Sequence, residues 1–133
     1  MQIIITEWAL QSYLDLVHTG TVPHAEYKSI LRPDVRKLQA YPTDVAFSNG
    51  KFWGPATDRS GNSVPDGYKM KWHNLGPGRV QLRLAVAMLG VRAFLCRAYV
   101  KTSSAQDKRE AAKLKDHIRD IHLGRHQVRG VLP

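Results

Sequence analysis

The sequence predicts an α+β fold, a small antiparallel sheet with helices on one face, built in the order strand–helix–helix–three strands–helix. Three observations support this prediction. Residues 68–73 and 79–88 alternate apolar and polar side chains with the period of two that is typical of half-buried strands, and an apolar run over 91–100 follows. Residues 7–18 and 104–124 carry apolar side chains at helical spacing. A length of 133 residues with 43% hydrophobic content suits a single domain over 1–133.

The N-terminus is expected to form a strand that leads into a helix. Gln2–Ile5 is a short β-branched run, which suits a strand beside the later sheet. Thr6 is placed to cap a helix over residues 7–18, and Gly20 lies just beyond its end. The side chains expected on its buried face are Leu10, Tyr13, Leu14 and Val17.

Prolines and turn residues divide the next segment. Pro23 is suited to open a second helical stretch, Pro33 interrupts it and Pro42 ends it, so the pattern predicts one broken helix or two short ones. Residues 43–67 lose periodicity and carry repeated turn signals, which predicts a long ordered loop. Trp53 in this loop is open to two interpretations, packing against the core or stacking on the bases of a single-stranded nucleic acid.

Two tight connections are expected to join the three later strands. Gly76-Pro77-Gly78 links the first two, and Leu89-Gly90 is interpreted as a hairpin loop that sets Met88 opposite Val91. One face of the resulting sheet is continuous and apolar, and the helices of residues 7–41 are expected to cover it. The side chains assigned to this face are Tyr68, Met70, Trp72, Leu82, Leu84, Val86 and Leu95.

The opposite face of the sheet is expected to be cationic. The period of two assigns to it five nitrogen-bearing side chains and no carboxylate: Lys69, Lys71, His73, Arg79 and Arg83. A slip of one residue in strand pairing would bury the arginines, so the pattern itself argues for this register.

The last helix is expected to begin at a cap formed by Ser103 or Ser104 and to end near Gly124. Its narrow apolar stripe comprises Ala111, Leu114, Ile118 and Ile121, and its remaining surface is charged. The cations assigned to RNA or phosphate binding, on this helix and the strands before it, are Arg83, Arg97, Lys108, Lys113 and Arg119. A solvated helix face is the plain alternative. The tail 126–133 shows little pattern and is expected to be partly disordered until a partner orders it.

Basic residues are distributed unevenly along the chain. Lys and Arg number 20 against 11 Asp and Glu, which gives a net charge of +9. Residues 1–67 hold 6 basic and 7 acidic side chains, whereas residues 68–133 hold 14 and 4. This balance predicts a polyanionic partner, a nucleic acid, an acidic protein or a membrane surface, that binds the second half of the chain.

The sequence predicts neither a cofactor nor a metal. It contains no nucleotide-binding glycine motif and no paired-cysteine zinc spacing, and His117 and His122 stand five apart, which does not place them on one helix face. The single cysteine, Cys96, is interpreted as a core residue in a reducing compartment. The absence of a signal peptide and of a long apolar run predicts a cytoplasmic location without membrane contact.

Two stretches of the second half resemble the RelE/HigB branch of the RelE/ParE toxin superfamily, the toxins of type II toxin–antitoxin pairs. Tyr68-Lys69-Met70-Lys71 is similar to the Tyr-Lys-x-Lys strand of RelE-type toxins, and Arg79 and a hairpin follow at similar spacing. The run 94–102, Phe-Leu-Cys-Arg-Ala-Tyr-Val-Lys-Thr, looks like the last strand and helix start of HigB-type toxins. The first half resembles these toxins only in its strand–helix–helix order.

This resemblance implies a RelE-like fold with a concave basic surface, and an endoribonuclease that cuts messenger RNA in the ribosomal A site and inhibits translation. It also implies an acidic cognate antitoxin as partner. Lys69, Lys71 and Arg79 match basic catalytic positions of the family, and Lys101 stands near a terminal-strand cation. The chain departs from RelE early in the last helix, where Lys108 falls near the place of a tyrosine.

Cleavage of RNA without a metal requires a base for the 2′-OH proton, cations for the charge that develops on the phosphate, and an acid for the 5′-oxygen. Lys69 or Lys71 is the expected base, because neighbouring cations lower the pKa of a lysine. Arg79 and Arg83 are the expected phosphate ligands, and His73 or Lys101 is the expected acid. A non-catalytic protein, either a ParE-like gyrase inhibitor or a basic RNA-binding module, is the alternative, since a basic surface alone gives affinity.

Overall fold

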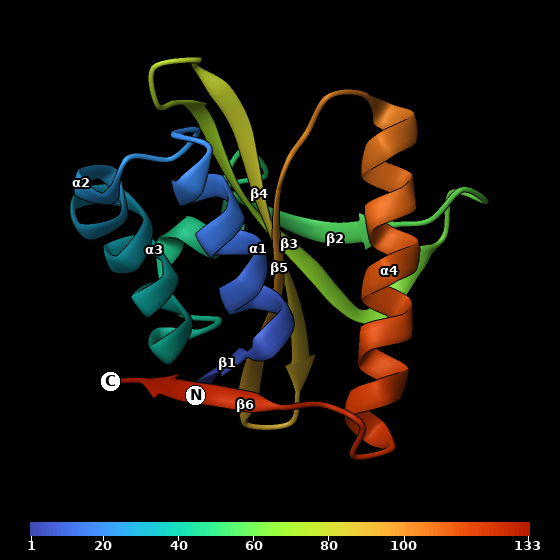
Figure 1. Ribbon diagram of the computed structural model, residues 1–133. Coiled ribbons are helices and arrows are strands. Elements are labelled where there is room, and N and C mark those ends of the chain that lie inside the picture. Colours follow the sequence, from blue (N-terminus) through green and yellow to red (C-terminus); the bar gives the residue numbers. More distant parts are fainter.

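A six-stranded mixed sheet with the strand order β2-β3-β4-β5-β1-β6 forms the centre of the computed structural model, which describes residues 1–133 (Figure 1). The strands are β1 (Gln2–Thr6), β2 (Trp53–Thr57), β3 (Ser63–Leu75), β4 (Val80–Leu89), β5 (Arg92–Val100) and β6 (Val128–Leu132). The α+β class predicted from the sequence is confirmed. The prediction of an antiparallel sheet is wrong at one pair, because β1 runs parallel to β5.

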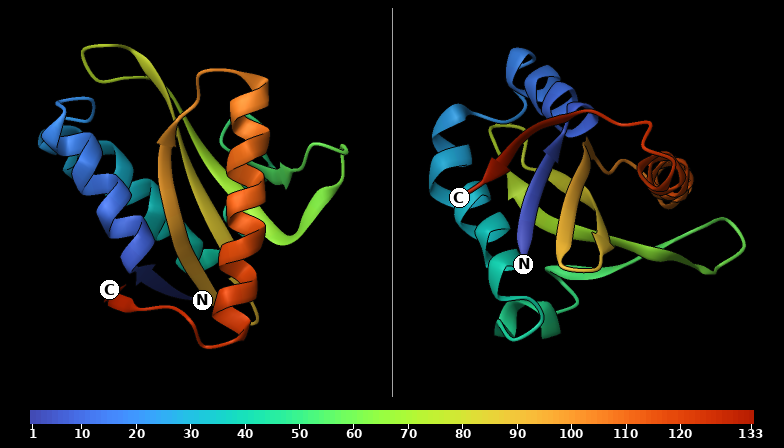
Figure 2. Two further views of the ribbon diagram at one scale, coloured as in Figure 1. Left: turned by 45° about the vertical axis from the view of Figure 1, so that its right-hand side comes forward. Right: turned by 90° about the horizontal axis from the view of Figure 1, so that it is seen from below.

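Helices cover both faces of the sheet, so the prediction that they lie on one face is wrong. The N-terminal helix α1 (Glu7–His18) and the helical segment 24–40 cover one face, and α4 (Ser104–His122) covers part of the other (Figures 1 and 2). Two separate apolar clusters of 18 and 11 buried residues follow from this arrangement. The stripe of Leu114 and Ile118 packs on small side chains of the sheet, among them Ala85 and Ala87, which leave room for a helix. None of the helices is long and apolar enough to cross a membrane.

The helix α1 begins and ends as predicted but buries a different face. The Thr6 hydroxyl accepts a hydrogen bond from the Ala9 amide at 3.2 Å, which caps the helix. Ala9 and Ser12 are its buried residues, while the predicted Leu10, Tyr13, Leu14 and Val17 are only half-buried. Small residues let α1 approach the sheet closely enough for Ser12 Oγ to accept the Ala98 amide of β5 at 2.9 Å.

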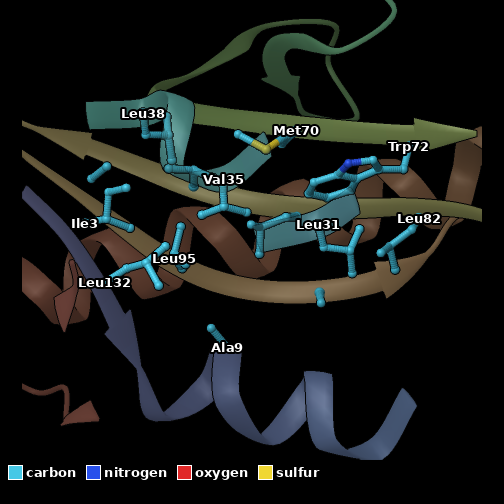
Figure 3. Packing of buried hydrophobic residues seen from close by; sticks show 14 of the residues in the cluster. Ile3, Ala9, Leu31, Val35, Leu38, Met70, Trp72, Leu82, Leu95 and Leu132 are labelled. Carbon is cyan, nitrogen blue, oxygen red and sulfur yellow. The ribbon is translucent and has the colours of Figure 1, made fainter. Parts of the chain in front are cut away.

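Residues 24–40 form a continuous run of short helical turns, so the helical content is as predicted but the interruption expected at Pro33 is absent. The run comprises α2 (His24–Glu26), the π-helical turn η1 (Tyr27–Leu31), α3 (Arg32–Arg36) and the 3-10 turn η2 (Lys37–Ala40). Pro33 lies in the first turn of α3, where its missing amide leaves no helical hydrogen bond unmade. Leu31, Val35 and Leu38 point from this run onto the sheet beside Met70 and Trp72 (Figure 3).

Residues 43–67 form a short 3-10 turn, η3 (Val45–Ser48), the strand β2 and the start of β3, so the prediction of a loop over this range is wrong. The sequence pattern did not predict β2, because it contains Gly54 and Pro55, two residue types that are rare in strands. A proline is tolerated there because β2 is an edge strand, whose outer amides need no partner. Trp53 is 6% exposed and its ring stacks on Tyr68 with centroids 5.1 Å apart, so the packing interpretation is correct.

The β4–β5 hairpin has the predicted faces but a different turn. Leu89 pairs with Arg92 and Met88 with Ala93, so the turn is Gly90-Val91 instead of Leu89-Gly90. The partner of Met88 differs from the predicted one by two residues, which leaves Ala93 and Leu95 on the predicted face. Leu82, Leu84 and Val86 accordingly pack under α1 and α3, as predicted. The buried thiol of Cys96 lies on the α4 side, and burial raises its pKa to about 12.

The C-terminal tail is ordered, which corrects the prediction of partial disorder. Residues of β6 pair antiparallel with β1, and Leu132 is buried in the larger apolar cluster. Glu7 at the start of α1 forms an ion pair with Arg129. The strand β1 pairs with β5 along one edge. On its other edge, β6 satisfies the backbone amides and carbonyls that would otherwise be unpaired.

Candidate functional site

Four cations meet on the face of the sheet that carries α4, and we call them the basic cluster: Lys69, Lys71, Arg83 and Lys101. Strand pairing aligns Lys71 of β3 with Arg83 of β4 and Arg83 with Tyr99 of β5, so three polar side chains form one row across the sheet. Lys69 lies two residues from Lys71 on the same face of β3. Lys101 follows β5, where its amide donates to the Gln81 carbonyl at 2.8 Å.

The carboxylate of Asp107, in the first turn of α4, lies against this row. It accepts a hydrogen bond from the Tyr99 hydroxyl at 2.5 Å and forms an ion pair with Lys69. Burial raises the pKa of Asp107, but the bonds from Lys69 and Tyr99, together with the charges of Lys69 and Lys101, outweigh burial and lower it overall. Burial and the bond to Asp107 raise the pKa of Tyr99, so this hydroxyl stays protonated.

Lys71 is the most accessible cation of the row and has no carboxylate partner. Its Nζ donates to the Gly50 carbonyl at 2.8 Å. Gly54 on the neighbouring strand makes room for it, since a Cβ at Gly54 would lie 3.3 Å from Lys71 Nζ. Burial lowers the pKa of Lys71, and the charges of Lys69, Arg83 and Lys101 lower it further. Deprotonation of Lys71 therefore costs less free energy than deprotonation of an ordinary surface lysine.

Arg83 supplies positive charge from beneath the surface. The residue is 5% exposed, and its Nη1 donates to the Leu82 carbonyl at 3.1 Å. Its Nε is buried and has no hydrogen-bond partner. Arg83 therefore holds a fixed charge beside Lys71 but has little surface with which to bind a phosphate directly.

The other two predicted members of the cationic face form no hydrogen bond or ion pair with the basic cluster. Arg79 was assigned to this face by strand parity, but β4 begins at Val80 and Arg79 occupies the preceding turn with φ of 51°, so strand parity does not apply to it. This turn packs toward the α1–α2 connection, where the Gly76 amide donates to Glu26 at 2.9 Å. His73 is exposed, and its two ring nitrogens contact Gln81 Oε1 at 2.6 Å and the Lys51 carbonyl at 2.8 Å.

Most of the cations assigned to phosphate binding near α4 have internal partners. Arg97 and Lys113 both contact Glu110, at 2.8 and 3.1 Å. Arg119 pairs with Asp116 at 3.6 Å on the exposed surface of the helix. Lys108 is exposed and forms no ion pair, so it remains available to an external anion.

Sequence reasoning missed Tyr99 and Asp107 as parts of the site. A signal for Asp107 was present, because residue 107 continues the buried stripe of α4 by one turn beyond Ala111, and an acidic side chain on a buried stripe needs a cationic partner. Tyr99 could not be placed with Lys71, because a bulge between Ala85 and Val86 shifts the pairing of β5.

The arrangement can bind an anion and can exchange a proton. Four cations share one carboxylate, so the basic cluster has an excess of positive charge that attracts phosphate groups. Lys71 is a group whose charged form is disfavoured, so its amine is neutral at a lower pH than the amine of an ordinary lysine would be. Comparisons of the chain with protein-family models, with curated proteins and with solved structures gave no match.

Proposed function

We propose that the chain is the toxin of a type II toxin–antitoxin pair, a metal-independent endoribonuclease that cuts messenger RNA on the ribosome. The observation that carries this proposal is Lys71, a partly exposed lysine whose pKa is lowered by burial and by three neighbouring cations. The resemblance of residues 68–71 and 94–102 to RelE- and HigB-type toxins supports it independently.

The chemistry assigns a role to three members of the basic cluster. Neutral Lys71 removes the 2′-OH proton, and the 2′-oxygen attacks phosphorus while the bond from phosphorus to the 5′-oxygen breaks. The charges of Arg83 and Lys101 stabilise the additional negative charge on the phosphate. Lys101 then returns a proton to the departing 5′-oxygen. Lys71 is a better candidate base than Lys69, because the amine of Lys69 is engaged in an ion pair with Asp107.

A non-catalytic RNA- or protein-binding role is a second candidate, favoured by a specific observation. Lys69 forms an ion pair with Asp107, Arg79 lies in the β3–β4 turn and both nitrogens of His73 have partners. Few groups besides Lys71 and Lys101 are then free for chemistry, whereas the positive surface alone suffices for binding.

Incubation of the purified protein with translating ribosomes, followed by mapping of new RNA 5′ ends, separates the two candidates. The nuclease produces new 5′-hydroxyl ends within ribosome-bound messenger RNA and leaves 2′,3′-cyclic phosphates on the upstream fragments. A binding protein sediments with ribosomes or RNA and produces no new ends. If intact messenger RNA is recovered while the protein is bound, the nuclease assignment is wrong.

A further inference from the structure

The turn of residues 49–52, which immediately precedes β2, contacts the basic cluster through Lys71. At the end of this turn, the Phe52 carbonyl accepts the Lys71 amide at 2.7 Å. Two side chains of β3 bind the preceding residues. Lys71 Nζ donates to the Gly50 carbonyl at 2.8 Å, and His73 Nε2 lies 2.8 Å from the Lys51 carbonyl. The tip of the turn, Gly50 and Lys51, is therefore fastened to the sheet by the side chains of Lys71 and His73.

The ring of His73 joins this turn to β4. Its Nε2 donates to the Lys51 carbonyl, since a carbonyl oxygen can only accept. Its Nδ1 lies 2.6 Å from Gln81 Oε1 on β4. A carboxamide offers an oxygen or, after rotation, an NH₂ group, so Gln81 can pair with Nδ1 whether the ring is neutral or charged. Although His73 is exposed, its ring thus has one partner in the sheet and one in the turn.

The Gly50 carbonyl restricts the orientation of the Lys71 amine. An amine in water rotates freely, whereas an amine that donates to a fixed carbonyl has one N–H direction set and presents its lone pair elsewhere. The space around this amine is narrow, because a Cβ at Gly54 would lie 3.3 Å from Lys71 Nζ. Since Gly50 and Lys51 are neighbours in the chain, a bond that holds the Lys51 carbonyl also limits the movement of the Gly50 carbonyl.

We propose that His73 is a positioning residue for Lys71: by tying the Lys51 carbonyl to Gln81, its ring holds the Gly50 carbonyl in place and so orients the Lys71 amine. The effect of His73 on cleavage rests on the proposed nuclease function, whereas its effect on Lys71 is measured without a substrate. This role differs from that of the acid expected from the sequence. An acid acts on the 5′-oxygen by itself, whereas a positioning residue acts only through Lys71.

NMR titration of the lysine side chains in the intact protein tests the contact, and Lys71→Ala identifies the signal of Lys71. In His73→Ala the turn is expected to loosen and expose the amine. Lys71 should then titrate at higher pH than in the wild type, because burial is the largest cause that lowers its pKa. Gln81→Ala removes the other end of the bridge and should shift the titration in the same direction. A titration of Lys71 that is unchanged in His73→Ala would overturn the proposal.

Two control variants separate the bridge from the charges around it. Lys51→Ala removes an exposed side chain of the turn and keeps the carbonyl that His73 contacts. His122→Ala removes an exposed histidine of α4. Neither variant is expected to move the titration of Lys71. A shift in Lys51→Ala as large as that in His73→Ala would show that the carbonyl contact is not the cause, and would overturn the proposal.

Single-turnover cleavage on saturated ribosomes separates positioning from acid catalysis. His73→Ala is expected to slow cleavage about tenfold, because the base is less well oriented. The same change should have no further effect in a Lys71→Ala background, where the oriented amine is already gone. A further tenfold loss in the double variant His73→Ala/Lys71→Ala, or cleavage by His73→Ala at the wild-type rate, would overturn the proposal. If the wild type cuts no RNA, the proposed nuclease function is wrong, and the titration of Lys71 alone decides whether His73 positions its amine.

Discussion

The carboxylate of Asp107 joins three elements, because it lies on α4 and accepts hydrogen bonds from Lys69 on β3 and Tyr99 on β5. Its side chain is 10% exposed and that of Lys69 is 17% exposed, so water screens this ion pair little. Removal of one partner from such a pair leaves a shielded charge without compensation. Asp107 therefore contributes both to the stability of the α4 face and to the charge of the basic cluster.

Asp107→Asn is expected to lower the free energy of unfolding at pH 7 by about 3 kcal/mol, because Lys69 loses its counter-charge. The folded state lowers the pKa of Asp107 below its ordinary value of 3.8, so its contribution is complete above pH 3.8 and is lost as the pH falls through the folded value. Denaturant unfolding of both proteins across this range should show the difference shrinking at acidic pH. A difference that stays constant down to pH 2 would show that the charge of Asp107 is not its cause.

If the chain is the proposed nuclease, the pH dependence of its cleavage tests the role of Lys71. A lysine acts as a base only when neutral, so the single-turnover rate should rise with pH and level off below 10.5, the ordinary lysine pKa, because burial and neighbouring cations lower the pKa of Lys71. Asp107→Asn removes the one neighbouring charge that raises this pKa and should move the plateau to lower pH. Lys115→Ala, at an exposed position of α4, should leave the profile unchanged. A rate that is flat with pH would rule out Lys71 as the base.

Side-chain parity along single strands was predictable from the sequence, whereas contacts between elements were not. Lys69, Lys71 and Arg83 lie on one face as the alternation predicted. Arg79 does not, because a positive φ and the turn geometry remove it from the strand. The partners of Asp107, Lys69 and Tyr99, are set by the packing of α4 on the sheet, and no local sequence pattern identifies them.

The β3–β4 turn is held against the helical layer by backbone contacts, which restricts the residue that can occupy position 76. Gly76 has φ of 72°, and a Cβ there would lie 2.4 Å from the Thr21 carbonyl oxygen. Gly90, in the β4–β5 turn, has φ of 62°, but a Cβ there would meet no atom within 4 Å. The two glycines share a left-handed backbone and differ in their surroundings.

Gly90→Ala is expected to cost about 1 kcal/mol from the left-handed backbone alone. Gly76→Ala is expected to cost about 3 kcal/mol, since the new methyl also forces the turn away from Thr21. Thermal or denaturant unfolding of the two variants measures both values. Equal losses of stability would show that the turn does not pack on Thr21 in solution.

At the scale of elements, long periodic segments were predicted well and short edge strands were not. The ranges of α1 and α4 and the β4–β5 hairpin follow from strong periodicity. The strand β2 contains Gly54 and Pro55, and β6 has only five residues, so neither has a pattern that favours a strand. Each is a strand because it pairs with a neighbouring strand, β2 with β3 and β6 with β1. The choice of face by α4 depends on small residues of the sheet that sequence periodicity does not reveal.

Over the whole molecule, the positive charge of residues 68–133 is partly neutralised by their own carboxylates. Glu110 and Asp116 on α4 pair with Arg97, Lys113 and Arg119. Lys108 and Lys115 on the same helix are exposed and form no ion pair. An external polyanion, either a ribosome or an acidic antitoxin, should therefore interact more strongly with Lys108 and Lys115 than with the cations of α4 that already have partners.

Binding to ribosomes is expected to weaken steeply with salt, because phosphate contacts release counterions. The double variant Lys108→Ala/Lys115→Ala should reduce the slope of log affinity against log salt by about 1–2, whereas Lys113→Ala/Arg119→Ala should change it less. Ribosome pelleting at several salt concentrations measures these slopes. Equal slopes for the two double variants would contradict the role assigned to the internal ion pairs.

Single-turnover cleavage on saturated ribosomes tests whether Lys71 within the basic cluster is the base of a ribosome-dependent nuclease. We expect Lys71→Ala to lower the cleavage rate by about 10²-fold or more and to leave ribosome pelleting nearly unchanged, while Lys115→Ala cuts at the wild-type rate. Cleavage by Lys71→Ala at the wild-type rate under saturation would show that Lys71 is not the base.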